Sequence, residues 1–204
     1  MKEIIPIACD HAGYELKIAV IEHLETAGYQ VRDYGTNSTE SCDYPDFAHK
    51  VGFVIDEGLF SRGIVICGSG NGVQMTVNKY RGVRCALCWN VEIAHLARQH
   101  NDSNVLSLPA RFISKELAMQ IVDEFMNTDF EGGRHQRRVE KINKILTNNS
   151  KDAEFIRKLA EMSKMLNSVI DAHKQNASND NTSANDDPSL NNTSFFFNMN
   201  SMVD

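Results

Sequence analysis

The stretch from Ile64 to Gly72 constrains the fold of this chain more than any other segment. Its sequence, Ile-Val-Ile-Cys-Gly-Ser-Gly-Asn-Gly, is an apolar run that ends at Cys67 and then alternates glycine with small polar residues. A short apolar run that meets a glycine-rich turn is typical of a buried parallel strand leading into a helix. Glycine lets the backbone approach a ligand closely and turn its N–H groups toward it. We therefore predict a parallel α/β sheet with a ligand site at the carboxyl end of this strand.

The neighbouring segments alternate between strand and helix patterns. The sequence predicts strands over 4–9, 29–34, 64–67, 83–89 and 105–108, and helices over 14–27, 45–57, 73–79, 91–99, 114–126 and 132–146. Such alternation with short loops predicts a Rossmann-like, three-layer αβα fold around a five-stranded parallel sheet. We expect the strand order 2-1-3-4-5, which brings Cys9-Asp10-His11 and Cys67-Gly68-Ser69 to the same crevice.

The composition changes after about residue 147. We expect a globular domain over 1–147, an amphipathic C-terminal helix over 148–175 and an Asn/Ser-rich, disordered tail over 176–204. The predicted helix carries an apolar seam with 4-3-4-3 spacing, made by Phe155, Leu159, Met162, Leu166 and Val169. This spacing fits either a short coiled coil or a helix docked on its own domain.

Charge and cysteine usage narrow the function further. The formal net charge of −6 over 204 residues argues against general binding to nucleic acid or to anionic membranes. No apolar run approaches the ~20 residues that a membrane-spanning helix needs. Because no secretory signal precedes the first strand, we expect the five cysteines to be reduced thiols in a cytoplasmic protein.

Several common functions of glycine-rich or cysteine-containing loops do not fit this sequence. The loop reads G-x-G-x-G after the third strand and lacks Gly-Lys-Ser/Thr, which argues against dinucleotide and P-loop binding. Val73 stands where a cysteine phosphatase would carry its phosphate-clamping arginine. Cys85 and Cys88 form a C-x-x-C pair, but on a strand they point to opposite faces and are better interpreted as buried core thiols.

Other polar residues remain candidates for a binding site. His100-Asn101-Asp102 is predicted to lie between the fourth helix and the fifth strand, so that only a second subunit or a long loop could bring it to the crevice. Arg134 and Arg138 are four residues apart, and one helix face therefore presents both guanidinium groups. Such a pair suits phosphate binding, although solvated helix charge is an equal alternative.

Six segments, in order along residues 3–146, resemble the type B ribose-5-phosphate isomerases, a family shared with galactose-6-phosphate isomerase subunits. The segments are Cys9-Asp10-His11-Ala12-Gly13, Asp43-Tyr44-Pro45, Cys67-Gly68-Ser69-Gly70-Asn71-Gly72, Asn78-Lys79, 98–106 and 132–138. The resemblance implies the interconversion of ribose 5-phosphate and ribulose 5-phosphate in the pentose phosphate pathway, without metal or cofactor. It also implies a homodimer with each active site built from two chains, and a tetramer is the alternative assembly.

The resemblance also implies a role for each matching residue. Cys67 is the base that moves a proton between C1 and C2, His100 opens the furanose ring, Ser69 handles hydroxyl protons, and Asp10 lies near the sugar. The implied substrate-binding residues are His11, Tyr44, Gly68, Gly70, Asn71, Gly72, Asn101, Arg111, Arg134 and Arg138.

One position departs from a branch of this family. That branch has glycine in place of the cysteine and a glutamate in the loop, whereas this chain has Cys67 and carries Val73 at the glutamate position. We therefore expect Cys67 to be the base. An isomerase of a six-carbon sugar phosphate, such as allose or galactose 6-phosphate, and a non-catalytic sugar-phosphate-binding relative are the alternative hypotheses.

Overall fold

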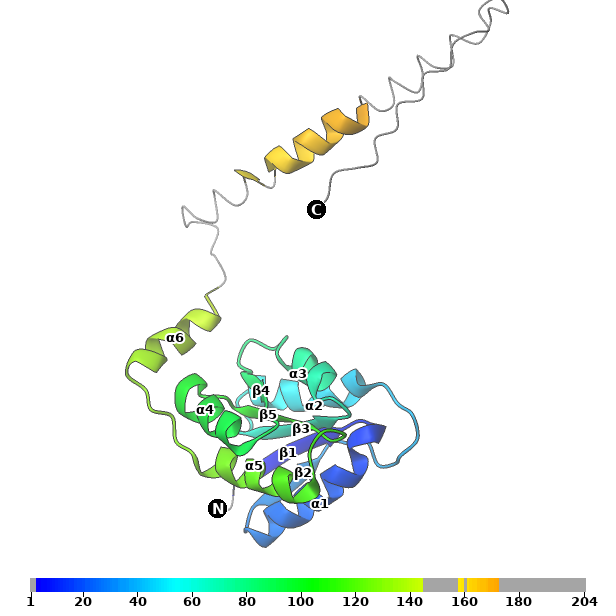
Figure 1. Cartoon of the computed structure of the whole chain (residues 1–204), viewed down its shortest axis with the longest axis vertical. Coiled ribbons are helices and arrows are strands. Elements are labelled where there is room, and N and C mark those ends of the chain that lie inside the picture. Colours follow the sequence, from blue (N-terminus) through cyan, green and yellow to red (C-terminus); the bar gives the residue numbers. More distant parts are fainter. Residues whose placement is uncertain (1–2, 145–157, 160, 173–204) are drawn as a thin grey trace, which may run out of the picture. The chain divides into compact units, whose positions relative to one another are not determined.

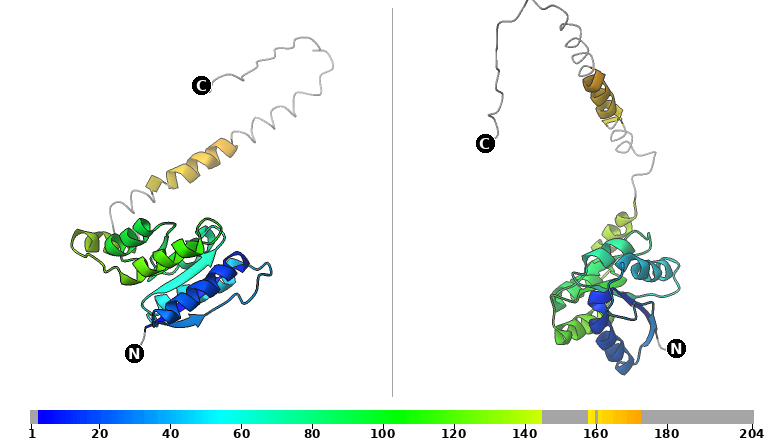
Figure 2. Two further views of the ribbon diagram at one scale, coloured as in Figure 1. Left: turned by 60° about the horizontal axis from the view of Figure 1, so that its bottom comes forward. Right: turned by 90° about the vertical axis from the view of Figure 1, so that its right-hand side faces the viewer.

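The computed structural model describes residues 3–144, 158–159 and 161–172 (Figure 1). The chain divides after Lys144 into two units, which are described one at a time. In the first unit, a parallel sheet is covered by helices on both faces, as the views in Figure 2 show. The predicted Rossmann-like αβα class is therefore confirmed.

The elements follow the predicted alternation closely. The strands are β1 (Ile4–Cys9), β2 (Gln30–Asp33), β3 (Gly63–Cys67), β4 (Cys85–Leu87) and β5 (Val105–Pro109). The helices are η1 (His11–Gly13), α1 (Tyr14–Thr26), α2 (Tyr44–Asp56), α3 (Asn71–Val77), α4 (Val91–Asn101), α5 (Lys115–Asn127) and α6 (Arg134–Ile142).

The predicted strand order is wrong in one place. The sheet runs β2-β1-β3-β5-β4, so β5 lies beside β3 and β4 takes the edge. The burial of the two strands gives the physical reason. All five residues of β5 are buried, as a strand between two neighbours must be, whereas β4 has only three residues and two of them are partly exposed. The order places the loop after β5 directly against the loop after β3.

Two apolar clusters lie on opposite faces of the sheet. On one face, Ile64 and Ile66 of β3 pack in a cluster that includes α1, α4 and α5. On the other face, Val65 and Cys67 pack with buried residues of α2 and α3. The alternation follows from the two-residue period of a strand. It directs the Cys67 side chain toward the α2 and α3 side of the sheet.

The second unit is described only over 158–159 and 161–172, and these residues are helical and exposed. Leu159, Met162, Leu166 and Val169 of the predicted seam are 49–65% exposed. Phe155 and the predicted tail over 176–204 lie outside the described residues. In the part of the chain that the structure describes, no helix is both long and apolar enough to cross a membrane.

Candidate functional site

The loop after β1 is pinned against the end of β3. The Asp10 amide donates to the carbonyl of Ile66 at 3.1 Å, and the Asp10 carboxylate accepts from the Gly13 amide at 2.9 Å. A side chain at Gly13 would put its Cβ 2.9 Å from the Ile66 carbonyl oxygen, so only glycine allows this approach. The two loops that were predicted to share a crevice therefore lie in contact.

The loop after β3 wraps around the sulfur of Cys67. Cys67 is 5% exposed, and the amide of Gly70 donates to its Sγ at 3.1 Å. Gly70 has φ +74°, a left-handed conformation that glycine adopts without strain. The hydroxyl of Ser107 in β5 donates to the Gly70 carbonyl at 2.7 Å and thereby ties the turn to the neighbouring strand. A thiolate at Cys67 would thus be stabilised by a fixed backbone N–H.

Arg111 reaches this loop because β5 lies beside β3. The Ala110 amide donates to the Cys67 carbonyl at 2.9 Å, and the Arg111 amide donates to the Gly68 carbonyl at 3.0 Å. The Arg111 side chain lies so close to Gly68 that a Cβ there would be 3.3 Å from its Cδ. In the predicted order 2-1-3-4-5, a whole strand would have separated Arg111 from Cys67. The corrected strand order thus places Arg111 against the loop that follows Cys67, in the wall of a cavity that both residues line.

His11 and Tyr44 also contribute to the wall formed by these loops. The Cys42 amide donates to His11 Nδ1 at 3.3 Å, so Nδ1 is the acceptor and the neutral ring carries its proton on Nε2. Tyr44 begins α2, and its ring would be 2.7 Å from a Cβ at Gly72. The lack of a side chain at Gly72 therefore leaves the room in which the tyrosine ring lies.

These loops enclose a cavity of about 360 Å³, a size typical of small-molecule sites. It is lined by Asp10, His11, Ala12, Tyr44, Cys67, Gly68, Ser69, Gly72, Arg111 and Phe112. Eight of the predicted site residues are in this set. Gly70 and Asn71 belong to the same loop but do not line the cavity. Sequence reasoning gave no role to Ala12, which was part of the matching segment 9–13, or to Phe112, whose only signal was its position next to Arg111.

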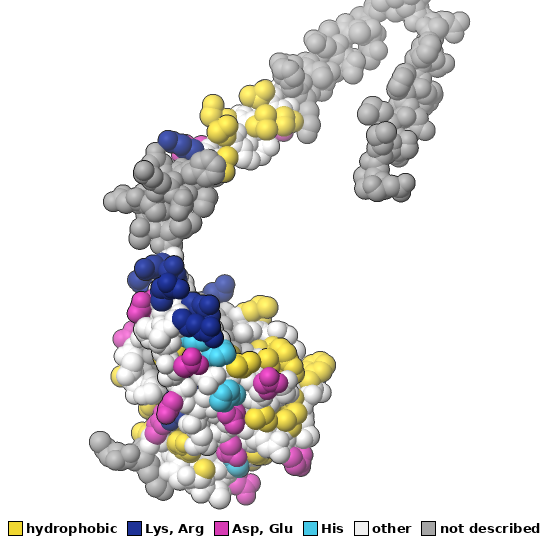
Figure 3. All heavy atoms as spheres, turned by 60° about the vertical axis from the view of Figure 1, so that its left-hand side comes forward, with side chains coloured by type: hydrophobic (Ala, Val, Ile, Leu, Met, Phe, Trp, Pro, Cys, Tyr) yellow, Lys and Arg dark blue, Asp and Glu magenta, His cyan; other side chains and the backbone are white. Residues whose placement is uncertain are grey.

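The remaining four predicted residues lie on α4 and α6. His100 and Asn101 close α4, where His100 belongs to the last helical turn rather than to the predicted loop. Arg134 and Arg138 are exposed residues of α6. Figure 3 shows lysine and arginine side chains gathered at this end of the first unit, next to histidine side chains. Among the described residues, none of the four lines the cavity with Cys67.

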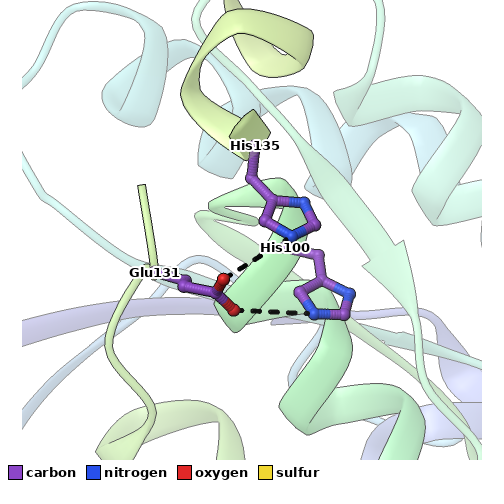
Figure 4. Close-up of side chains that lie close together, drawn as sticks. All are labelled: His100, Glu131 and His135. Atoms are coloured by element: carbon purple, nitrogen blue, oxygen red, sulfur yellow. Dashed lines mark ion pairs between the residues drawn. The ribbon is translucent and has the colours of Figure 1, made fainter. Parts of the chain in front are cut away.

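His100 also contacts two residues that had no predicted role. Its ring stacks on that of His135 with centroids 4.2 Å apart, and Glu131 lies 3.9 Å from both imidazoles (Figure 4). His135 was part of the matching segment 132–138, and that position was its only sequence signal.

The buried thiols of Cys9, Cys85 and Cys88 are poor bases and nucleophiles, because burial keeps them protonated. Burial raises the pKa of Cys9 to about 12 and that of Cys88 to about 12, and it raises the pKa of Cys85 as well. Cys85 and Cys88 pack in the clusters on opposite faces of the sheet, as the strand period predicted. The interpretation of the C-x-x-C pair as core thiols is therefore confirmed.

Fold and cavity define an α/β protein with a small-ligand site at the carboxyl edge of a parallel sheet. The family model of the Ribose/Galactose Isomerase matches residues 5–142. Ribose-5-phosphate isomerase B of Escherichia coli is 44% identical over 141 residues, which cover 69% of this chain and 95% of that protein. A probable ribose-5-phosphate isomerase B of Mycoplasma pneumoniae is 48% identical over 143 residues, covering 70% of this chain and 94% of that one.

Solved structures give the same result. A ribose 5-phosphate isomerase from Thermotoga maritima superposes with a TM-score of 0.69 at 48% identity, over 71% of this chain and 100% of that one. Ribose-5-phosphate isomerase B from Mycoplasma genitalium, solved with bound ribulose 5-phosphate, gives 0.68 at 45% identity, over 71% and 96%. The chain belongs to the Ribose/Galactose Isomerase family.

Proposed function

We propose that this chain is a cofactor-independent aldose–ketose isomerase that interconverts ribose 5-phosphate and ribulose 5-phosphate in the cytoplasm. The observation that carries the proposal is the buried Cys67 sulfur, which lines one cavity with His11 and Arg111 and accepts a hydrogen bond from the Gly70 amide. A base beside anion-binding groups is what this reaction needs. The relatives named as ribose-5-phosphate isomerases B favour a five-carbon substrate.

The central step is a proton transfer between neighbouring carbons. The Cys67 thiolate takes the proton from C2 of the open-chain aldose, and the electrons move onto the carbonyl oxygen to form an enediolate. The same thiol then returns the proton to C1, which gives the ketose. Backbone N–H groups of the loop 68–72, other than the Gly70 N–H that donates to Cys67 Sγ, stabilise the developing negative charge, and each such donor contributes roughly 3 kcal/mol. Ser69, which is exposed in the cavity wall, exchanges the hydroxyl protons.

The substrate phosphate is held away from the reacting carbons. His11 offers its Nε2–H and Arg111 its guanidinium from within this cavity. Arg134 and Arg138, one helical turn apart on α6, add two bidentate donors. Anchoring the phosphate fixes C1 and C2 against the thiolate and so removes part of the entropic barrier.

We further propose that His100, Asn101, Arg134 and Arg138 act on the site of a second copy of the chain in a homodimer. His100 and Asn101 end α4, Arg134 and Arg138 lie in the first five residues of α6, and among the described residues none of the four lines the cavity that holds Cys67. A furanose must open before C2 can lose its proton, and the proposed acid–base group for that step is His100. A site completed by a partner subunit would supply it.

The reaction is tested by incubating the purified full-length chain with ribose 5-phosphate and following ribulose 5-phosphate by NMR. We expect conversion to the equilibrium mixture, and slower turnover of allose and galactose 6-phosphates. Binding of ribose 5-phosphate without any turnover would favour the non-catalytic alternative. Faster turnover of a six-carbon phosphate would shift the assignment within the family.

The shared site is tested by subunit exchange. His100→Ala and Cys67→Ala proteins should each be inactive in isomerising ribose 5-phosphate. After the two are mixed and allowed to exchange subunits, mixed dimers should regain one intact site each. If activity never returns although mass spectrometry detects mixed dimers, the two residues act within one chain.

A further inference from the structure

A buried histidine lies between two of the proposed functional groups. His135 is in the first turn of α6 and only 4% exposed, although its polar neighbours Arg134 and Gln136 are exposed. Its ring lies parallel to that of His100, with an interplanar angle of 2° and centroids 4.2 Å apart. Figure 4 shows the carboxylate of Glu131 facing both rings, 3.9 Å from Nε2 of each.

The arrangement does not suit a metal ion. Ligand atoms of His100, Glu131 and His135 lie within 4.8 Å of one another, which is close enough to raise the question. A histidine nitrogen, however, binds a metal along its lone pair, in the plane of the ring. Two stacked rings with parallel planes cannot both place one ion in their planes. The geometry instead suits ring stacking and hydrogen bonding.

The second contact of His135 is with Arg134. The Arg134 Nε–H donates to His135 Nε2 at 3.2 Å, so this ring nitrogen is the acceptor and carries no proton. Burial lowers the pKa of His135, as do the nearby His100, Arg134 and Arg138, while Glu131 opposes them. The neutral ring is therefore the favoured form near pH 7. It can hold the arginine on its edge and the other imidazole on its face.

We propose that His135 is a positioning residue that fixes His100 by stacking and Arg134 by hydrogen bonding, and thereby sets the distance between the ring-opening and phosphate-binding groups. This inference rests on the proposed function, which assigns those roles to His100 and Arg134. The placement has a chemical advantage, because the phosphate and the ring oxygen of one sugar must be engaged together.

Two substitutions separate the two contacts. His135→Phe keeps an aromatic face for His100 but offers no acceptor to Arg134. We expect it to raise KM about tenfold for both ribose 5-phosphate and ribulose 5-phosphate. His135→Gln keeps an acceptor but lacks the ring. We expect it to leave KM within about twofold and to lower kcat for ribose 5-phosphate about tenfold.

A second assay isolates the ring-opening step. Ribulose 5-phosphate cannot close a furanose, because its O5 carries the phosphate. Deuterium exchange from D₂O into its C1 position therefore requires proton transfer but no ring opening. We expect His135→Gln to keep the wild-type exchange rate while its conversion of ribose 5-phosphate falls. Gln136→Ala, at an exposed neighbouring position on α6, is the matched control and should behave as wild type in both assays.

The outcomes separate the inference from the function on which it rests. An active wild type together with two His135 variants that match it in both assays overturns the positioning role alone. So does an equal loss of conversion and exchange in both variants, which a purely structural role would produce. A wild type that neither converts nor exchanges overturns the proposed function and the inference with it. If His135→Phe fails to fold, as thermal melting would show, the His135→Gln comparison still decides.

Discussion

Replacing Ser107 by alanine should weaken catalysis without touching the cavity. The Ser107 hydroxyl is fully buried and donates to the Gly70 carbonyl at 2.7 Å, beneath the turn whose amide reaches Cys67 Sγ. Loss of a buried hydrogen bond costs about 1–3 kcal/mol. Because the Gly70 carbonyl also accepts from the Gln74 amide at 3.2 Å, we expect a loss of unfolding free energy of about 1–1.5 kcal/mol.

The effect on activity should be larger than the loss of stability implies. Removing one hydrogen-bond donor from a site that stabilises charge lowers kcat about 100-fold or more. Without the Ser107 hydroxyl the Gly70 N–H is held less firmly, so we expect kcat/KM to fall by at least about tenfold. Steady-state kinetics with ribose 5-phosphate and urea denaturation measure the two effects.

Ser103→Ala is the matched control. The Ser103 hydroxyl is buried and donates to the carbonyls of Arg84 and Val105, at 2.6 and 3.2 Å, but neither carbonyl belongs to the Cys67 loop. The Ser103→Ala variant should lose a similar amount of unfolding free energy and keep the wild-type kcat/KM. The reasoning is refuted if Ser107→Ala stays within about twofold of wild type, or if both variants lose activity equally.

Two further predictions concern the thiols and the phosphate. At pH 8 a thiol with a pKa of about 12 is ionised in only about one molecule in ten thousand, so iodoacetamide should leave Cys9 and Cys88 unmodified in the native protein. Mass spectrometry that finds either alkylated as fast as an exposed thiol contradicts this. Arg138→Ala should raise KM for ribose 5-phosphate about tenfold, whereas Arg137→Ala, on another face of α6, should leave it unchanged. Equal KM increases in both variants would indicate a general charge effect.

The five strands of the sheet and the helices between them could be predicted because each element carries its own local pattern. The apolar run before Cys67 and the glycines after it specify the buried strand and the turn, whatever lies beside them. The order of β4 and β5 is different, since it depends on which strand can be buried on both faces. Residues 105–108 are apolar except for Ser107, which favours a buried strand, but the sequence predicted a longer strand over 83–89. In the structure only Cys85–Leu87 of that segment is paired.

Only some contacts in the site could be predicted from local sequence patterns, and the others depend on how distant segments pack. Cys67, Asp10 and His11 follow strands that are neighbours in the predicted order, so their meeting could be expected. The contact of Ser107 with Gly70 depends on the corrected strand order, and no local pattern encodes it. The stack of His135 on His100 depends on how α6 packs on α4, which is equally non-local.

Deuterium exchange at C1 of ribulose 5-phosphate is the most direct test of the central claim that Cys67 is the base. NMR in D₂O follows the exchange for wild type, Cys67→Ala and His100→Ala. We expect wild type to exchange, Cys67→Ala to lose the reaction by about 100- to 10,000-fold, and His100→Ala to retain it, because no ring must open. Exchange by Cys67→Ala at the wild-type rate would contradict the assignment of Cys67.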